Sequence, residues 1–163
     1  MGMGLRLKTL CAAAVLGALA ASLAACGSSN PTGGLLGNID KARSAQTLSS
    51  LEQGLIAVQS TNVDSGGGAD AASLAAALQQ RDPSNRYTTA PPTDVGIVQV
   101  VGGGGGPVML VGITAPPSTG KPPPYLALWS SGGSMLFYLG QQPPQYTTTA
   151  PSGPGWSTSP PQA

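Results

Sequence analysis

Four short apolar runs between Val95 and Leu139 constrain the fold of this chain more than any other feature. They are rich in β-branched and aromatic residues, and glycine or proline separates them: Val95–Val101, Val108–Ile113, Tyr125–Trp129 and Ser134–Leu139. Such runs predict β-strands. Gly132-Gly133 predicts a tight two-residue turn, and the five glycines Gly102–Gly106 predict a long, mobile hairpin loop. The segment therefore predicts four antiparallel strands.

The segment Ile39–Gln59 predicts the longest helix. Its apolar residues recur at spacings of three and four, which places them on one helical face: Ile39, Ala42, Ala45, Leu48, Leu51, Leu55 and Val58. Asn38 is a suitable N-cap, and Asp40 would lie in the first turn, where the helix dipole favours a negative charge. We expect the apolar face to pack on the sheet.

A second, shorter helix is predicted from about Asp70 to Gln80, with Asp70 as its cap and Pro83 preventing much continuation. Ser84–Asp94 is then a polar, proline-containing connector. Together these elements predict an α+β fold, in which an amphipathic N-terminal helix packs on a small antiparallel sheet of about four strands. One domain would span residues 39–140.

The segments on either side of this domain have a different composition. Residues 26–38 are small, polar and glycine-rich, which predicts a flexible tether. Residues 141–163 consist mainly of Pro, Gln, Thr, Ser and Gly and contain no charge. Such a tail has little apolar surface to offset its ordering entropy, so we expect it to be disordered or extended. Trp156 is the one side chain there suited to docking.

The N-terminus predicts an export signal. Arg6 and Lys8 precede a largely apolar, alanine-rich stretch from Leu10 to Ala25. This stretch has about 16 residues, whereas a membrane-spanning helix needs about 20. A basic start, a short apolar region and small residues at its end are typical of a cleaved signal peptide.

The end of this signal, Leu23-Ala24-Ala25-Cys26, resembles the lipobox of bacterial lipoproteins. The resemblance implies cleavage after residue 25 and a diacylglycerol on the sulfur of Cys26. The protein would then be exported and anchored through its lipid to the bacterial cell membrane, facing outward. One fatty chain binds a membrane only marginally, so two or three chains on one cysteine suit a stable anchor. The alternatives are a plain secretory signal with a chance cysteine and an uncleaved signal anchor.

The charge of the processed chain excludes one class of partner. Without residues 1–25, five basic residues stand against six acidic ones, a formal net charge of −1. No basic run is present, which argues against nucleic acid as a partner. Cys26 is the only cysteine that remains, so the domain has no disulfide and depends on its apolar core.

The residues needed for common catalytic and metal sites are missing. The chain has no histidine, which excludes Ser-His-Asp and Cys-His catalysis and the usual zinc and haem ligands. We therefore predict no cofactor, no metal and no catalytic residue. Ser118 and Lys121 match the S-x-x-K pattern of penicillin-binding enzymes. However, Pro122-Pro123-Pro124 follows them and excludes the helix that this pattern needs.

Four aromatic residues on neighbouring predicted strands are the candidate interaction surface: Tyr125, Trp129, Phe137 and Tyr138. If one sheet face is left uncovered, they could bind a partner protein or a glycan. The alternative is that they pack in the core and across strands.

A long helix, a connector and then a meander of strands is similar to the globular domain of type IV pilins and pseudopilins. The residues that carry the likeness are Lys41-Ala42-Arg43-Ser44-Ala45-Gln46 with Leu51 and Leu55, and the strands around Gly132-Gly133. The resemblance implies a role in a pilus or type II secretion assembly. A lipobox stands where pilins carry a prepilin-peptidase site. A generic α+β domain and a mostly irregular body are the alternatives.

These features together predict a non-enzymatic, membrane-anchored lipoprotein that serves as an interaction or structural module of the cell envelope. Its partners would be membrane lipid, through acylated Cys26, and an envelope protein. One alternative is a hydrolase or acyl-transfer enzyme that uses Ser118 and Lys121. The other is a solute-binding lipoprotein, although about 100 ordered residues leave little room for a two-lobed cleft.

Overall fold

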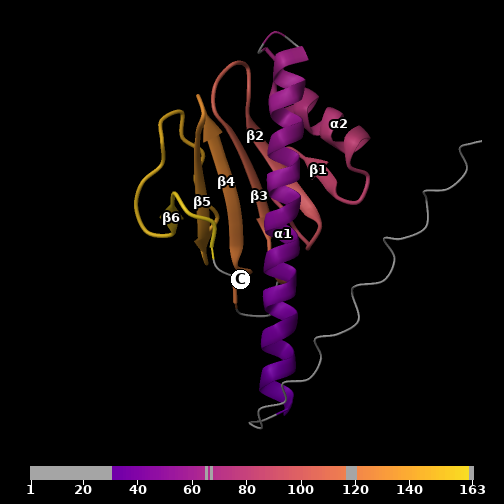
Figure 1. Cartoon of the computed structure of the whole chain (residues 1–163), viewed down its shortest axis with the longest axis vertical. Helices are drawn as coiled ribbons and strands as arrows, with labels where there is room; N and C mark the ends of the chain where they lie inside the picture. Colours follow the sequence, from indigo (N-terminus) through magenta and orange to yellow (C-terminus); the bar gives the residue numbers. More distant parts are fainter. Residues whose placement is uncertain (1–30, 65, 67, 117–120, 162–163) are drawn as a thin grey trace, which may run out of the picture.

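Two helices and a six-stranded sheet make up the part of the chain that the computed structural model describes, residues 31–64, 66, 68–116 and 121–161. The helices are α1 (Pro31–Asp64) and α2 (Ala71–Arg81), and both lie on one face of the sheet (Figure 1). The strands are β1 (Arg86–Thr88), β2 (Ile97–Gly102), β3 (Val108–Ile113), β4 (Tyr125–Ser131), β5 (Ser134–Gly140) and β6 (Trp156–Ser157). The predicted α+β class is confirmed.

The sheet has the strand order β1-β2-β3-β4-β5-β6, so each strand pairs with its neighbours in the sequence. The four predicted strands correspond to β2–β5 and pair antiparallel, as expected. The prediction of about four strands was too low, because β1 pairs parallel to β2 and β6 pairs antiparallel to β5. These two strands have three and two residues, too few to show an alternating pattern.

Both predicted hairpins are present, but only one of the two turns was predicted correctly. Ser131 pairs with Ser134 across the two-residue turn, whose glycines have φ values of +55° and +85°. The loop Gly102–Gly106 was expected to be mobile and is instead anchored. The amide of Gly104 donates to the carbonyl of Ala69 at 2.8 Å, which ties the loop to the residues before α2.

Helix α1 is longer than predicted at both ends. It begins at Pro31, a residue whose fixed φ and missing N–H suit the first helical position. The backbone of residues 31–38 is therefore helical, and the predicted tether is wrong for that part; residues 26–30 lie outside the described chain. Asn38 is not the N-cap and Asp40 is not in the first turn, because the helix starts earlier.

From Thr47 onward, α1 packs on the sheet. Leu51, Leu55 and Val58 are buried there, as the apolar spacing predicted. In the first half, Ala42 and Ala45 are exposed and Ile39 is 39% exposed, contrary to the prediction of one continuous buried face. Figure 1 shows the reason, since the N-terminal part of α1 extends beyond the end of the sheet. No described helix is both long enough and apolar enough to cross a membrane.

Helix α2 begins as predicted. The carboxylate of Asp70 accepts a hydrogen bond from the amide of Ser73 at 2.8 Å, which is the N-cap interaction. Leu74, Ala75 and Leu78 are buried against α1, β1 and β2. Both helices and the sheet face beneath them form what we call the helix-side core: Leu51, Leu55, Val58, Ala69, Leu74, Ala75, Leu78, Tyr87, Val98, Val100, Val108, Leu110, Leu126, Leu128 and Phe137.

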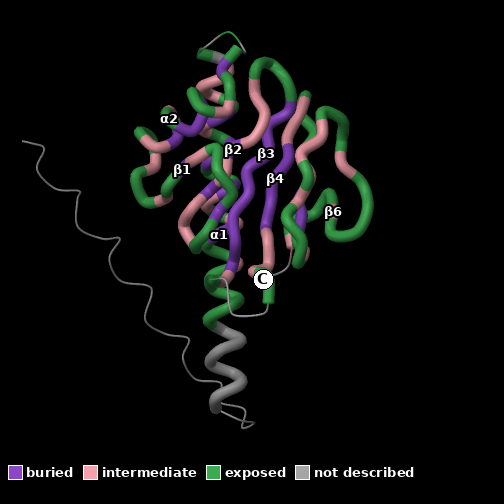
Figure 2. The backbone as a smooth tube through the Cα atoms, turned by 180° about the vertical axis from the view of Figure 1, so that it is seen from behind, coloured by how far each residue is buried: buried purple, intermediate pink, exposed green. Residues whose placement is uncertain are grey.

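The other face of the sheet is also covered. All six residues of β3 are buried, although alternate side chains of a strand point to opposite faces. Figure 2, seen from behind, shows β3 and β4 buried along most of their length. A second cluster lies on this face, and we call it the tail-side core: Met109, Val111, Ala127, Trp129 and Tyr138.

Residues 141–161 provide part of this cover, so the predicted disorder is wrong for them. Tyr146 and Trp156 pack against the tail-side core, and β6 extends the sheet. The composition of the tail predicted disorder because the tail has few apolar residues. Two aromatic side chains, Tyr146 and Trp156, nevertheless provide its packing on the sheet. The remaining residues of the predicted tail, 162–163, lie outside the described chain.

Candidate functional site

Two of the candidate functional residues, Cys26 and Ser118, lie outside the described part of the chain. Cys26, with the whole of the predicted signal peptide, precedes the described residues, so its lipidation stays a prediction. Ser118 lies in the undescribed segment 117–120. Lys121 is described and its side chain is exposed, next to the proline run that leads into β4. No geometry therefore links Ser118 to Lys121.

The four aromatic residues of the candidate surface fall on two faces of the sheet. Phe137 belongs to the helix-side core, whereas Trp129 and Tyr138 belong to the tail-side core. Tyr125 is half-buried beside that second cluster. Because Phe137 and Tyr138 are consecutive in β5, they must point to opposite faces.

An open aromatic surface is therefore the wrong interpretation for three of the four residues. Phe137, Trp129 and Tyr138 are 3%, 3% and 8% exposed. The indole N–H of Trp129 donates to the carbonyl of Thr147 at 3.0 Å, which joins the buried strand β4 to the tail. Over Trp129 and Tyr138, this chain's own C-terminal segment occupies the position expected for a partner.

Two more hydrogen bonds fix the tail at separate points. The hydroxyl of Tyr146 donates to the carbonyl of Pro107 at 3.0 Å, and that of Tyr138 donates to the carbonyl of Gln142 at 2.9 Å. Each joins an aromatic side chain to a main-chain carbonyl. Irregular segments need such partners, because their carbonyls have no helix or sheet to satisfy them.

A groove lies between the tail and the tail-side core. Its volume is about 410 Å³. The aromatic side chains of Tyr138 and Trp156 form one part of its lining, and segments 143–145, 147 and 149–152 form the rest. The two rings pack at a centroid distance of 5.2 Å with an interplanar angle of 51°. The sequence indicated Tyr138 as a candidate surface residue and Trp156 as a side chain suited to docking. It did not indicate that the two residues line the same groove.

Charged residues are distributed unevenly along the chain. All of the acidic residues and every basic residue except Lys121 precede residue 95 in the sequence, and from residue 122 onward none is present. The groove beside Trp156 is thus lined entirely by uncharged side chains. A ligand there would find hydrogen-bonding and apolar groups but no ion-pair partner.

The most perturbed carboxylate lies at the end of α2. Burial raises the pKa of Asp82, but hydrogen bonds from Ser84, Asn85 and Tyr87 outweigh it and hold the pKa at about 2. The hydroxyl of Tyr87 donates to Asp82 Oδ2 at 2.8 Å. Burial and the Asp82 carboxylate raise the pKa of Tyr87 well above its usual value. Both groups thus keep one protonation state at neutral pH, which suits a structural junction between α2 and β1.

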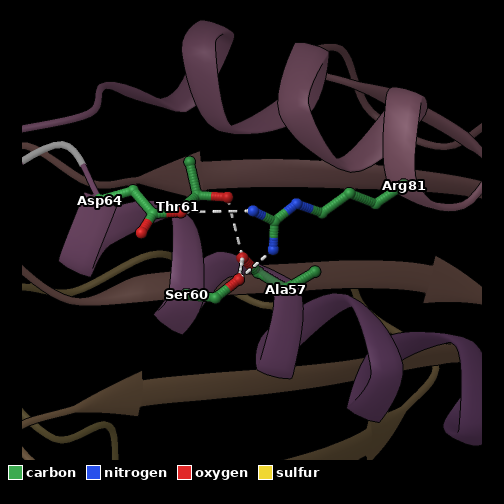
Figure 3. A network of polar contacts seen from close by, with 5 residues as sticks. All are labelled: Ala57, Ser60, Thr61, Asp64 and Arg81. Carbon is green, nitrogen blue, oxygen red and sulfur yellow. Dashed lines mark hydrogen bonds and ion pairs between the residues drawn. The ribbon is translucent and has the colours of Figure 1, made fainter.

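A second polar cluster joins the two helices (Figure 3). The guanidinium of Arg81 on α2 donates to the hydroxyl of Ser60 and lies 3.4 Å from Asp64 Oδ2 on α1. Both charged side chains are largely exposed. Exposed ion pairs contribute little to stability, so this contact is a minor brace between α1 and α2.

Within the described part of the chain, no group of three Asp, Glu, His or Cys side chains is placed to hold a metal ion. A second cavity of about 330 Å³ lies between the C-terminal half of α1 and the two glycine turns. Its lining has no charged side chain: Leu55, Val58, Gln59, Asn62, Gly105, Gly106, Val108 and Ser130–Gly133.

Comparison with known proteins adds no assignment, because no protein-family model, no curated protein and no solved structure matches this chain. The pilin resemblance therefore stays a prediction.

Proposed function

We propose that this protein is a lipid-anchored, non-enzymatic module of the bacterial cell envelope, held by a diacylglycerol on Cys26. The observation that carries the proposal is the placement of this cysteine. It follows the small residues that end the apolar leader, and only four residues separate it from Pro31, where α1 begins. The lipid would therefore join the body almost directly through a helix.

The projecting half of α1 supports this arrangement. Among the residues of α1 whose burial the structure describes, from Ile39 onward, Thr47 is the first that is buried. It lies sixteen positions after Pro31, which at about 1.5 Å per residue corresponds to about 24 Å of helix. Such a helix can hold the sheet away from the bilayer surface and leave it accessible to other envelope components.

The chemistry of the described residues supports a role without catalysis. The chain has no histidine, and Asp82, its most perturbed carboxylate, is committed to three neighbouring side chains. A hydrolase or acyl transferase that uses Ser118 and Lys121 is the competing proposal. Loss of a measured hydrolytic activity in Lys121→Ala, with the fold intact by circular dichroism, would establish that enzyme instead.

Three exposed residues of α1, at positions 39, 42 and 45, favour one kind of envelope role. Ala42 and Ala45 are exposed and Ile39 is partly so, on the face that continues the buried stripe of the second half. We propose that this face binds an envelope protein, in an assembly of the pilus or type II secretion kind. Ala42→Glu should then abolish co-purification of that protein, whereas Ile56→Glu, at an exposed position farther along α1, should not.

The lipid is tested with the two cysteines of the chain. Cys26→Ala should abolish palmitate labelling and partitioning into a detergent phase. Cys11→Ala is the matched control, because Cys11 lies within the leader and should leave both unchanged. If Cys26→Ala still partitions with detergent, the leader is an uncleaved anchor and the proposal fails.

A further inference from the structure

We infer that the groove between Tyr138, Trp156 and the C-terminal tail binds an uncharged oligosaccharide. Its volume of about 410 Å³ lies within the range of about 300–1,000 Å³ that is usual for small-molecule sites. This inference goes beyond the proposed function and does not depend on the lipid, so either can fail alone.

The aromatic part of the groove is rigidly placed. Trp156 lies in β6, where it pairs with Tyr138, and its amide donates to the carbonyl of Gly153 at 3.3 Å. The amide of Leu139 donates to the carbonyl of Gly155 at 3.0 Å, immediately before it. The indole is half-buried, so part of its surface faces the groove. A fixed, partly accessible indole is a suitable platform for the apolar C–H face of a pyranose ring.

The polar part of the lining supplies neutral hydrogen-bonding groups. Gln145, Thr149 and Ser152 line the groove and are exposed. Within the described chain, the side chains of Gln145 and Ser152 make no hydrogen bond to other protein groups. An amide and hydroxyls both donate and accept, which matches the hydroxyl and acetamido groups of sugars.

The absence of charge selects among ligands. No Asp, Glu, Lys, Arg or His occurs between residues 122 and 161. An anionic or cationic ligand would lose hydration in the groove without gaining an ion pair, which disfavours it. A neutral sugar loses only hydrogen bonds to water, and the lining can replace these.

A proline-rich peptide is the other ligand that aromatic grooves commonly take. The groove favours a sugar because the chain's own Pro143, Pro144 and Pro151 already form part of its wall. The surface that remains combines a single indole with hydroxyl and amide groups.

The test is titration of the full-length protein, purified in detergent, with defined probes. The probes are chitotriose and maltotriose as neutral sugars, sialyllactose as an anionic one, and a proline-rich decapeptide. Binding is followed by isothermal titration calorimetry and by tryptophan fluorescence. We expect saturable binding of at least one neutral trisaccharide and none of sialyllactose.

Paired variants locate the binding site. Thr149→Ala removes a hydroxyl from the groove, whereas Thr148→Ala changes the adjacent exposed threonine that does not line it. Gln145→Ala and Gln141→Ala form a second pair of the same design. We expect the groove variants to weaken the affinity about threefold to tenfold, as loss of one or two hydrogen bonds would. The control variants should keep the parent affinity.

Three results would overturn the inference. The first is no saturable binding of either neutral trisaccharide at concentrations up to about 10 mM, beyond the weakest affinities usual for specific sites. The second is binding of the peptide alone, which would make the groove a peptide site. The third is binding that Gln145→Ala and Thr149→Ala leave unchanged, which would place the sugar elsewhere.

Discussion

The two faces of the sheet are covered in different ways. Regular helices cover the helix-side core, whose fifteen buried residues are aliphatic except for Tyr87 and Phe137. An irregular segment contributes to the cover of the tail-side core, whose five buried residues include Trp129 and Tyr138. A helix satisfies its own backbone, so it needs only a complementary apolar stripe. An irregular segment needs hydrogen-bond partners as well, and aromatic side chains with polar ends provide both.

Because the helix-side core is the larger of the two, we expect a substitution there to cause the largest loss of stability. Leu51→Ala removes a side chain that is 0% exposed and leaves a cavity between α1 and the sheet. We expect a loss of about 3 kcal/mol in the free energy of unfolding, measured by urea denaturation. Ile56→Ala on the same helix is the control, because Ile56 is 68% exposed. An equal effect of the two variants would contradict the described packing of α1.

A smaller and more local effect is expected on the tail side. Trp129→Phe removes the indole N–H that donates to Thr147 and leaves a small cavity. We expect a loss of about 2 kcal/mol and faster proteolysis within residues 141–161. Tyr125→Phe is the control, because that half-buried ring has no hydrogen bond among the described residues. Unchanged proteolysis of Trp129→Phe would show that the tail does not depend on this bond.

The hydrogen bonds around Asp82 make the stability of the fold depend on pH. The pKa of this carboxyl is about 2 in the folded chain, against 3.8 for an ordinary aspartate. A lowered pKa stabilises the fold above the ordinary value, and this contribution is lost as the pH falls from about 4 to 2. Asp82→Asn should cost about 1 kcal/mol at pH 7.

The pH profile provides the check on that interpretation. Urea midpoints of the parent and of Asp82→Asn should converge between pH 4 and pH 2, because the parent loses the carboxylate there. Tyr87→Phe, which removes one of the donors to Asp82, should reduce the difference only in part. A gap between parent and Asp82→Asn that is the same at pH 2 and pH 7 would refute the assignment.

The smallest effect is expected at the brace between the helices. Arg81→Ala removes an exposed contact to Ser60 and Asp64. We expect no more than about 0.5 kcal/mol, and less at high salt, as is usual for exposed ion pairs. A loss above about 2 kcal/mol would indicate that α2 depends on this contact and not on Leu74 and Leu78.

The helix side could be predicted from sequence because its signals are periodic. Leu51, Leu55 and Val58 repeat at helical spacing, Asp70 marks a helix start, and glycine or proline residues separate the runs of β2–β5. The exposure of Ile39, Ala42 and Ala45 could not be predicted, because periodicity shows which residues share a face and not how far the sheet extends along it. Ile39 follows the pattern but is 39% exposed.

The tail side could not be predicted for a different reason. Its contacts join single aromatic side chains to distant carbonyls, such as Tyr146 to Pro107, and they leave no repeat in the sequence. Composition alone indicated disorder for residues 141–163. The available signal was the presence of Tyr146 and Trp156 in a segment otherwise poor in apolar residues, together with two apolar faces on the predicted strands.

Residues 141–161 form an outer layer of the folded domain, and hydrogen exchange can show it. The groups to follow by NMR at pH 7 are the Trp129 indole N–H and the Leu139 amide. Both groups donate to carbonyls of the tail, at Thr147 and Gly155 respectively. We expect both groups to exchange at least about a hundredfold more slowly than in an unfolded peptide. Exchange of both at the unprotected rate, with β3 and β4 still protected, would contradict it.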